Sequence, residues 1–286
     1  MRRSLGIAAG VLTHALFAYT LWHLVPFLWG SAPRVFGSLG IDFLLAGQFG
    51  LLHSILLHRT TRKRLEPFIS GPFYGLFFCV ATSLQLLPMM AFWHSSPLVV
   101  WQFTGLGRAA MLVGFVGSWA LLHYSLWLNG LGYQTGFTPW WNWVRGRPSR
   151  PRPFQVRGVY RLLRHPTYLS FMGTVWMTPT VTLDRAILIA IWTSYIFIGS
   201  WLKDRRLEFY LGEYYREYET RVPGYPGMIF GPLAKIRLPR QEQPAPAAPA
   251  IAADAAAGDS SSIERGIQPA SGRAAIMNQE LQLSSR

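Results

Sequence analysis

The residues best suited to chemistry stand together in one short stretch, residues 158–168, which reads Gly-Val-Tyr-Arg-Leu-Leu-Arg-His-Pro-Thr-Tyr. Pro166 suits the first position of a helix, because that position needs no backbone N–H donor. The residues that follow, beginning with Thr167, leave unpaired N–H groups that point back toward Arg164 and His165. A helix start beside an arginine binds anions such as a carboxylate or a phosphate. The stretch therefore predicts an anion-binding corner at the start of a helix.

The elements that must position this corner are long apolar segments. Half of the 286 residues are hydrophobic and only 14% are charged. Several uncharged runs reach the roughly 20 residues that a helix needs to cross a bilayer, so we expect an all-α, polytopic membrane protein with about six transmembrane helices. The first run is interpreted as a span, because no cleavage pattern of small residues follows it. The expected spans are residues 5–29, 40–58, 72–93, 107–128, 167–182 and 186–202.

The chain after residue 166 has three expected parts. Its two apolar runs are separated only by Leu183-Asp184-Arg185, which predicts a C-terminal helical hairpin. Residues 204–221 then place Leu and Tyr at helical spacing, as in an amphipathic helix at the membrane interface. Residues 239–286 are rich in Pro, Ala, Ser and Gln and are expected to be a disordered polar tail. The integral membrane domain is therefore expected to cover residues 1–238.

Positive charge is concentrated on one side of this predicted topology. The expected crossings place all but Arg34, Arg108 and Arg185 of the 27 Lys and Arg residues on the same side as both termini. Cytoplasmic loops carry such an excess, so both termini are predicted to be cytoplasmic. The net charge of +14 is then explained by topology, and no nucleic-acid partner is expected. Cys79 is the only cysteine, and no metal is expected either.

Two motifs flank the predicted hairpin. The first is Gly158-Val159-Tyr160 followed by Arg164-His165-Pro166-Thr167-Tyr168, and the second is Gly212-Glu213-x-Tyr215-x-x-Tyr218 followed by Arg221-Val222-Pro223. In this order they resemble the cofactor motif and the C-terminal signature of the isoprenylcysteine carboxyl methyltransferase family of membrane methyltransferases. Residues 50–54, 145–154 and 178–182 are similar to segments of that family's bacterial methanethiol S-methyltransferases. The resemblance covers roughly residues 5–226, with the cofactor region at 145–226.

This resemblance implies binding of S-adenosylmethionine and transfer of its methyl group to a small apolar or volatile thiol such as methanethiol. It also implies an integral protein of a bacterial inner membrane. Family members hold the cofactor with the first motif, with the segment before it, and with a glutamate at the end of the last span. Carried onto this chain, the cofactor-binding residues are Gln155, Tyr160, His165, Pro166, Thr167, Tyr168, Asp204, Glu208 and Tyr218.

The chain departs from the family at two positions. Lys203-Asp204 stands in place of the family's pair of glutamates, so Asp204, or Glu208 one turn further on, is expected to take the glutamate's role. Gly199 stands where isoprenylcysteine enzymes carry the arginine that binds the substrate's carboxylate. A free prenyl-cysteine carboxylate is therefore not expected to be the substrate.

The candidate catalytic residues are His53, Arg164 and His165. Tyrosine faces attract a sulfonium cation, and Arg164 suits the carboxylate of the cofactor. An arginine-rich entrance would raise the thiolate fraction of an acceptor whose intrinsic pKa is about 8.5. Because thiolate and sulfonium lose their charges as they react, a dry site favours the transfer. His53 lies within a span, where ionisable residues commonly serve function, and is assigned to the acceptor side.

Three alternatives remain open at this stage. The acceptor could be a lipid or another small molecule. The chain could be a non-catalytic membrane protein that keeps the fold, and Lys203 is the feature in its favour. It could also be a reductase, since some sterol reductases end in a similar domain, although the sequence holds no glycine-rich dinucleotide fingerprint.

Overall fold

A computed structural model describes residues 3–30, 37–148 and 154–236. Met1–Ile236 form one compact unit, and the predicted tail at 239–286 lies outside the described residues. The long helices are α1 (Arg3–Trp29), α2 (Leu39–Leu57), α4 (Gly71–Ala91), α5 (Gly105–Asn129) and α9 (Leu183–Leu211). The shorter elements are α3 (Arg59–Leu65), β1 (Val99–Gln102), α6 (Leu131–Gln134), α7 (Phe137–Val144), the 3-10 helix η1 (Gly158–Arg161), α8 (Pro166–Trp176), β2 (Thr180–Thr182) and α10 (Glu213–Arg221).

The prediction of an all-α polytopic membrane protein is confirmed. In the described part of the chain, five helices are long and apolar enough to cross a membrane, namely α1, α2, α4, α5 and α9. The sixth expected span, residues 167–182, is shorter than predicted. Its helix α8 has 11 residues, or about 16 Å at about 1.5 Å per residue, and it packs against α9 as the first arm of the expected hairpin.

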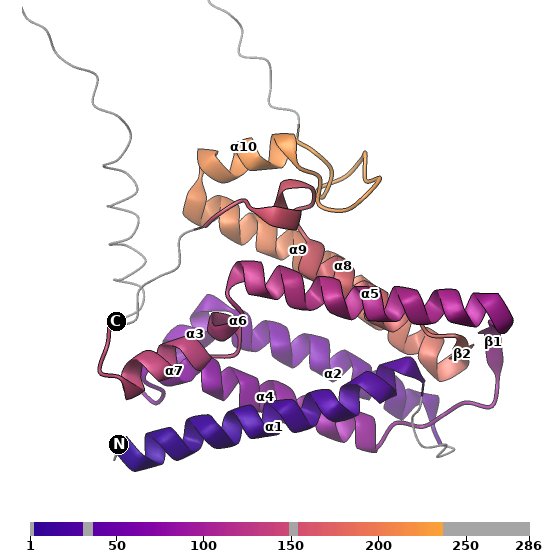
Figure 1. The fold of residues 1–286 in the computed structure, drawn as a ribbon, viewed down its shortest axis with the longest axis horizontal. Helices are drawn as coiled ribbons and strands as arrows, with labels where there is room; N and C mark the ends of the chain where they lie inside the picture. Colours follow the sequence, from indigo (N-terminus) through magenta and orange to yellow (C-terminus); the bar gives the residue numbers. More distant parts are fainter. Residues whose placement is uncertain (1–2, 31–36, 149–153, 237–286) are drawn as a thin grey trace, which may run out of the picture. The chain divides into compact units, whose positions relative to one another are not determined.

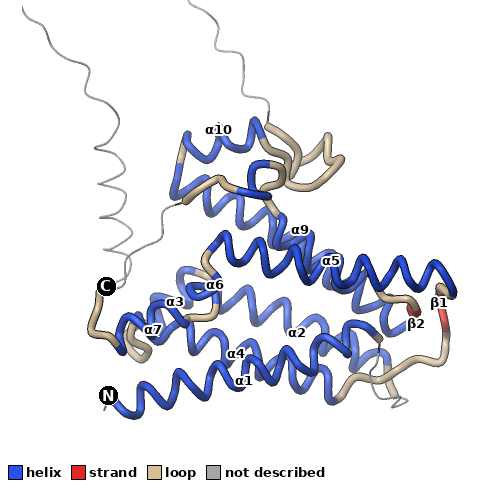
Figure 2. The backbone as a smooth tube through the Cα atoms, viewed as in Figure 1, coloured by secondary structure: helices blue, strands red, loops and turns tan. Residues whose placement is uncertain are grey.

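A small β-ribbon explains why α8 stops early. Residues 94–105 lie between two expected spans, and β1 within them pairs antiparallel with β2, joining Trp101 to Val181 and Gln102 to Thr180. The backbone N–H of Phe103 also donates to the carbonyl of Pro179 (2.8 Å). Proline cannot continue the helix, and the β-branched residues after it suit an extended strand. The ribbon therefore closes the end of the hairpin (Figure 2).

The interfacial helix begins later than expected. Residues 204–221 do not form a separate helix, because α9 continues through Asp204 to Leu211 and only α10 is separate. No glycine or proline interrupts residues 200–211, so nothing local ends the helix there. The break comes at Gly212, whose φ of 55° is a backbone conformation that glycine adopts without steric cost. Asp204 and Glu208 therefore belong to the last turns of the spanning helix.

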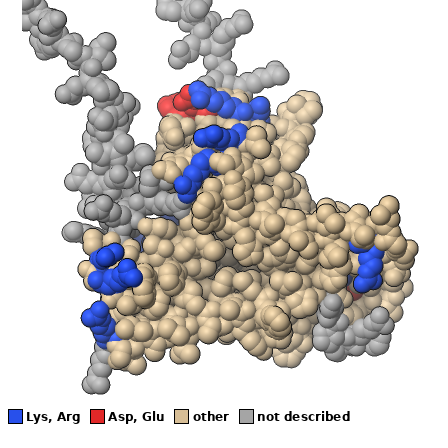
Figure 3. Space-filling view, viewed as in Figure 1, with Lys and Arg blue, Asp and Glu red and all other residues tan. Residues whose placement is uncertain are grey.

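The packing of the long helices brings the two motifs to the same end of this unit. The main helix contacts are α5 with α8, α1 with α4, and α2 with α9. The connecting elements α3, α6, α7 and η1 lie at the same end as α10, whereas β1 and β2 lie at the opposite end (Figure 1). On the face shown in Figure 3, Lys and Arg gather mainly around α10 and around the α7 end. This is the distribution that the positive-inside argument assumes.

Candidate active site

Helix α8 begins at Pro166, as the sequence predicts, whereas anion binding at this corner stays a prediction. Pro166 is the first residue of the helix, with His165 at the position before it. The 3-10 turn η1 leads into the corner from Gly158, whose φ is 54°. A Cβ atom at Gly158 would lie 2.6 Å from both the Leu128 side chain and the Tyr124 hydroxyl. Glycine is therefore required here by its backbone conformation and by the close approach of α5.

The C-terminal motif folds back over this corner. The backbone N–H of Arg164 donates to the carbonyl of Pro223 (2.9 Å), and that of His165 donates to the carbonyl of Gly224 (3.2 Å). The Tyr218 hydroxyl donates to the carbonyl of Tyr160 (2.6 Å). We call these two segments, residues 160–165 and 215–224, together with the Asp204 side chain that contacts both, the clasp. It brings the family motifs on either side of the hairpin into direct contact.

Asp204 lies at the centre of the clasp. Its Oδ2 atom is 3.0 Å from Nε2 of His165 and 3.1 Å from a terminal nitrogen of Arg164, while its Oδ1 atom accepts a hydrogen bond from the Tyr215 hydroxyl. All four residues are buried. A carboxylate only accepts hydrogen bonds, so this network assigns the proton of His165 to Nε2. Nδ1 of His165 is then a buried acceptor with no partner among the described residues.

The electrostatics of the clasp keep His165 neutral and the Tyr215 hydroxyl protonated. Burial lowers the pKa of His165, although the hydrogen bond to Asp204 opposes this effect. Burial, followed by the nearby Asp204 charge, raises the pKa of Tyr215. Burial also raises the pKa of Glu219 to about 7, against the opposing effect of Arg164. Glu219 is thus a carboxyl group that titrates near neutral pH, and the sequence reasoning did not single it out.

The contacts of Arg164 are all within the protein, although its Nε atom has no hydrogen-bond partner among the described residues. Its side chain is 0% exposed, and one terminal nitrogen donates to the carbonyls of Glu219 (3.3 Å), Val222 (3.1 Å) and Ala234 (3.2 Å). The other terminal nitrogen faces Asp204 and lies 3.9 Å from the Glu219 carboxylate. The guanidinium therefore ties the C-terminal segment to the corner, and its contacts are those of a residue that positions Asp204.

Tyr160 joins the corner to the end of α5. Its hydroxyl lies 2.9 Å from Oγ1 of Thr167 and 3.3 Å from the carbonyl of Ser125. It also accepts a hydrogen bond from the Asn129 amide, and Thr167 donates to the Ser125 hydroxyl (3.0 Å). The sequence reasoning missed Ser125 and Asn129. Their signal is that both are polar and stand four residues apart at the end of an apolar helix, which places them on one face.

The rings of Tyr160 and Tyr168 face the ammonium group of Lys203. The Nζ atom lies 5.4 Å from the centre of the Tyr168 ring and 6.0 Å from that of Tyr160. Both distances are within the range of cation–π attraction. The tyrosine pair that was expected to meet the cofactor's sulfonium thus faces a cation of the protein itself.

Three expected site residues lie outside this cluster. Glu208 is committed to ion pairs with Arg205 (3.3 Å) and Arg216 (2.7 Å). Gln155 is exposed, and the segment just before it, 149–153, lies outside the described residues. His53 on α2 packs against Phe78 and Tyr195, with ring centres 4.8 and 6.4 Å apart. The structure therefore groups Tyr160, Arg164, His165, Thr167, Tyr168, Asp204 and Tyr218.

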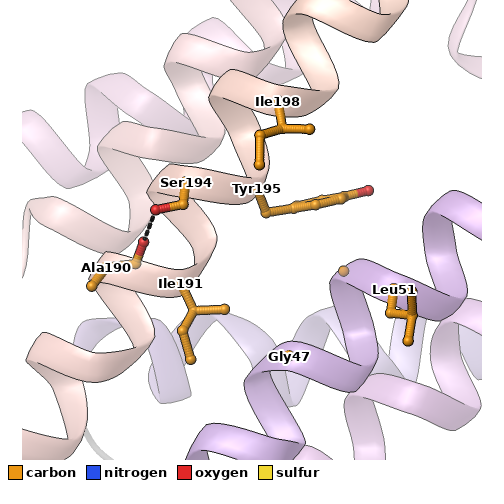
Figure 4. A pocket seen from close by; sticks show the side chains of 8 residues that line it. Gly47, Leu51, Ala190, Ile191, Ser194, Tyr195 and Ile198 are labelled. Carbon is orange, nitrogen blue, oxygen red and sulfur yellow. Dashed lines mark hydrogen bonds between the residues drawn. The ribbon is translucent and has the colours of Figure 1, made fainter.

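A groove between α2 and α9 runs beside His53. It has a volume of about 420 Å³ and a largely apolar lining that includes Gly47, Leu51, Tyr195 and Ile198. In Figure 4 the Tyr195 ring reaches from α9 toward α2, on which Gly47 and Leu51 lie. The next residue after Ile198 is Gly199, where a Cβ atom would lie 3.7 Å from the Tyr168 ring. The groove thus ends within one helical turn of the residues at the corner.

The chain resembles known proteins over most of its length. It is 27% identical over 225 residues to methanethiol S-methyltransferase 1 of Bradyrhizobium diazoefficiens, covering 74% of this chain and 79% of that protein. It is 28% identical over 201 residues to methanethiol S-methyltransferase of Pseudomonas deceptionensis, covering 69% and 74%. It is also 26% identical over 185 residues to Nurim of Xenopus laevis, covering 60% and 64%. No family model matches the chain, and no solved structure matches it.

The fold and the clasp define the class of this protein as an all-α integral membrane protein with a buried polar site at one end of its spanning helices. The relatives then narrow the class to one family of such proteins that the chain resembles. They confirm the resemblance to the isoprenylcysteine carboxyl methyltransferase-like family, and in particular to methanethiol S-methyltransferases.

Proposed function

We propose that this protein is a membrane methyltransferase that uses S-adenosylmethionine to methylate a small thiol, such as methanethiol, to a thioether. The observation that carries the proposal is the clasp around Asp204, which joins His165, Arg164 and Tyr215 beside the rings of Tyr160 and Tyr168. Relatives that match about three quarters of the chain are named for this reaction. Both termini are proposed to be cytoplasmic, which puts the clasp on the side where the cofactor is made.

The residues present fit such a cofactor. The tyrosine pair already faces a cation, and Nδ1 of His165 is a buried acceptor without a partner among the described residues. Tyr160, His165, Tyr168 and Tyr218 would hold the cofactor together with Gln155, Pro166 and Thr167. Asp204 would act with them, while Glu208 would contribute only if it left its surface ion pairs. No group of three or more His, Cys, Asp or Glu able to hold a metal ion occurs in the described ranges.

The cofactor would supply a methyl group activated by its sulfonium charge. The protein's own part is to orient the methyl donor and the acceptor, to exclude water from them and to set the charges around them. Asp204 holds the His165 ring in one tautomer, and Arg164 fixes Asp204 through the C-terminal segment. Burial of these groups excludes water, which favours a reaction that removes charge. Holding acceptor and donor in line supplies most of the rate enhancement. The apolar groove lined by Tyr195 suits an uncharged, volatile thiol that partitions into the bilayer. The thiol would lose its proton as its sulfur takes the methyl group, so that the products are the thioether, S-adenosylhomocysteine and a proton.

The test is the formation of dimethyl sulfide in the headspace of cells that express the protein and are fed methanethiol. The product should vanish with His165→Ala at equal expression, whereas His123→Ala should keep it. His123 is the matched control, because it is exposed on α5 and contacts Trp119 of its own helix, away from the clasp. Dimethyl sulfide formation that persists with His165→Ala would contradict the proposal.

A second candidate is a non-catalytic membrane protein with the same fold. Lys203 favours it, because the lysine's cation faces the tyrosine pair that would meet the cofactor. Calorimetry with purified protein separates the two functions. Binding of S-adenosylhomocysteine supports the methyltransferase, and its absence supports the non-catalytic protein. If S-adenosylhomocysteine binds but methanethiol is not methylated, the acceptor is instead a lipid or another small molecule.

A further inference from the structure

The position of Lys203 is unusual for a charged residue in a spanning helix. Its ammonium group lies within 6.0 Å of the centres of two tyrosine rings. Tyr160 belongs to η1 and Tyr168 to α8. The flexible side chain reaches from α9 toward η1 and α8. Its charged end is therefore directed into the site rather than away from it.

Lys203 has no carboxylate partner that would explain this position. Among the ion pairs of the described residues none involves Lys203. The nearest acidic residue in sequence, Asp204, is already occupied by His165, Arg164 and Tyr215. The faces of the two tyrosines are thus the contacts that the ammonium group makes among the described residues. Aromatic faces attract cations of any chemistry, ammonium and sulfonium alike.

We propose that Lys203 is a resident cation that fills the sulfonium position of the tyrosine pair and must leave it before S-adenosylmethionine binds. This inference rests on the proposed function for the identity of the ligand. Two cations cannot share the same aromatic faces without repulsion, and that repulsion is strong where water is scarce. Lys203 is then a specificity-determining residue that makes the site favour neutral S-adenosylhomocysteine over cationic S-adenosylmethionine.

The proposed role of Lys203 depends on its positive charge. A variant that removes the charge should therefore change the affinity for S-adenosylmethionine, and a variant that keeps the charge should not. Lys203→Met keeps much of the side-chain length and removes the cation, whereas Lys203→Arg keeps the cation. Lys235→Met is the matched control, because Lys235 is exposed and lies outside the clasp. All four full-length proteins are purified in detergent, and the Kd of each nucleoside ligand is measured by calorimetry.

We expect Lys203→Met to bind S-adenosylmethionine about tenfold more tightly than the wild type. Its affinity for S-adenosylhomocysteine should change less than about threefold, since that ligand carries no sulfonium. Lys203→Arg and Lys235→Met should resemble the wild type. The proposal is overturned if Lys203→Met weakens S-adenosylmethionine binding, because the lysine would then anchor the ligand. It is also overturned if both ligands shift equally.

A probe without the nucleoside separates this inference from the proposed function. Trimethylsulfonium carries the same cation alone, and its binding to a tyrosine pair is followed by tyrosine difference absorbance. If neither nucleoside binds any variant, the proposed function fails. Lys203 remains a resident cation in that case if trimethylsulfonium binds Lys203→Met and not the wild type. Equal binding by both proteins overturns the inference whatever the nucleosides do.

Discussion

His165 and Asp204 lie 39 positions apart in the sequence, yet Nε2 of the histidine is 3.0 Å from Oδ2 of the aspartate inside the protein. One residue opens the hairpin and the other stands in the last turns of its second arm. The whole hairpin therefore has to form before this pair can meet. The Asp204 carboxylate also contacts Arg164 and Tyr215. One carboxylate thus holds three residues of the clasp.

Removing the charge of Asp204 should break the clasp. Asp204→Asn leaves the buried guanidinium of Arg164 without its closest negative charge, and such losses typically cost about 3–5 kcal/mol. We expect a large drop in the melting temperature in detergent, together with loss of S-adenosylhomocysteine binding. Glu213→Gln is the control, because its pair with Arg216 is on the surface, where water screens ion pairs and they contribute little to stability. A melting temperature for Asp204→Asn equal to that of Glu213→Gln would contradict a central role for Asp204.

Glu219 should make stability depend on pH. Its pKa is raised from 4.5 to about 7, so the folded state binds a proton that the unfolded state has released. The stabilisation is present below about pH 4.5 and is lost as pH rises through about 7, a change of about 1–3 kcal/mol. We expect the melting temperature to fall between pH 5.5 and 8 in the wild type, and to fall less in Glu219→Gln. Glu217 is exposed, so Glu217→Gln should keep the wild-type dependence of melting temperature on pH. The same dependence in Glu219→Gln would contradict the role of Glu219.

The two parts of Tyr160 should have separable effects. Tyr160→Phe keeps the ring that faces the cation but removes the hydroxyl contacts with Thr167 and Asn129. It should cost about 1 kcal/mol of stability and leave ligand affinity within about twofold. Tyr160→Leu also removes the aromatic face. For S-adenosylmethionine we expect calorimetry to show about a 2- to 10-fold further loss of affinity; equal affinities in the two variants would argue that the ring meets no cation of the ligand.

Gly224→Ala should open the clasp by steric conflict. A Cβ atom there would lie 2.7 Å from the carbonyl oxygen of Leu233 and 3.2 Å from the His165 ring. The backbone must therefore shift away from His165, so we expect loss of activity and a lower melting temperature. Gly117→Ala on α5 is the matched control, because its Cβ would meet no atom within 4 Å and alanine favours a helix by about 1 kcal/mol. Comparable activity in the two variants would show that the site tolerates an open clasp.

Cysteine labelling tests the proposed orientation. The only native cysteine, Cys79, is buried, and Cys79→Ser supplies a cysteine-free background. Leu98→Cys and Phe230→Cys place a thiol at positions that are 63% and 85% exposed at opposite ends of the unit. An impermeant maleimide added to intact cells should label Leu98→Cys, and should reach Phe230→Cys only after the membrane is opened. The reverse pattern would place the clasp outside the cell.

Local patterns in the sequence accounted for most of the fold. The runs that predicted spans at 5–29, 40–58, 72–93 and 107–128 match α1, α2, α4 and α5 within about two residues, because span length depends on bilayer thickness and apolar composition. Pro166 marked the start of α8 for an equally local reason, its missing N–H. One error fell where distant segments decide. The ribbon pairs Val99–Gln102 with Thr180–Thr182, which are far apart in the sequence. The late start of the interfacial helix was a different error, a misreading of local signals, since no local signal ends α9 before Leu211.

The sequence by itself determined which residues are polar, where the first four spans lie and where α8 begins, since each of these depends on neighbours along the chain. Only the tertiary structure decided which polar groups meet. It turned Arg164 inward to the C-terminal carbonyls, left Glu208 on the surface, added Tyr215 and Glu219 to the site, and set Lys203 against two tyrosines. Those pairings bring together residues from the two ends of a folded hairpin, and their charges and hydrogen bonds depend on burial that no single segment creates alone.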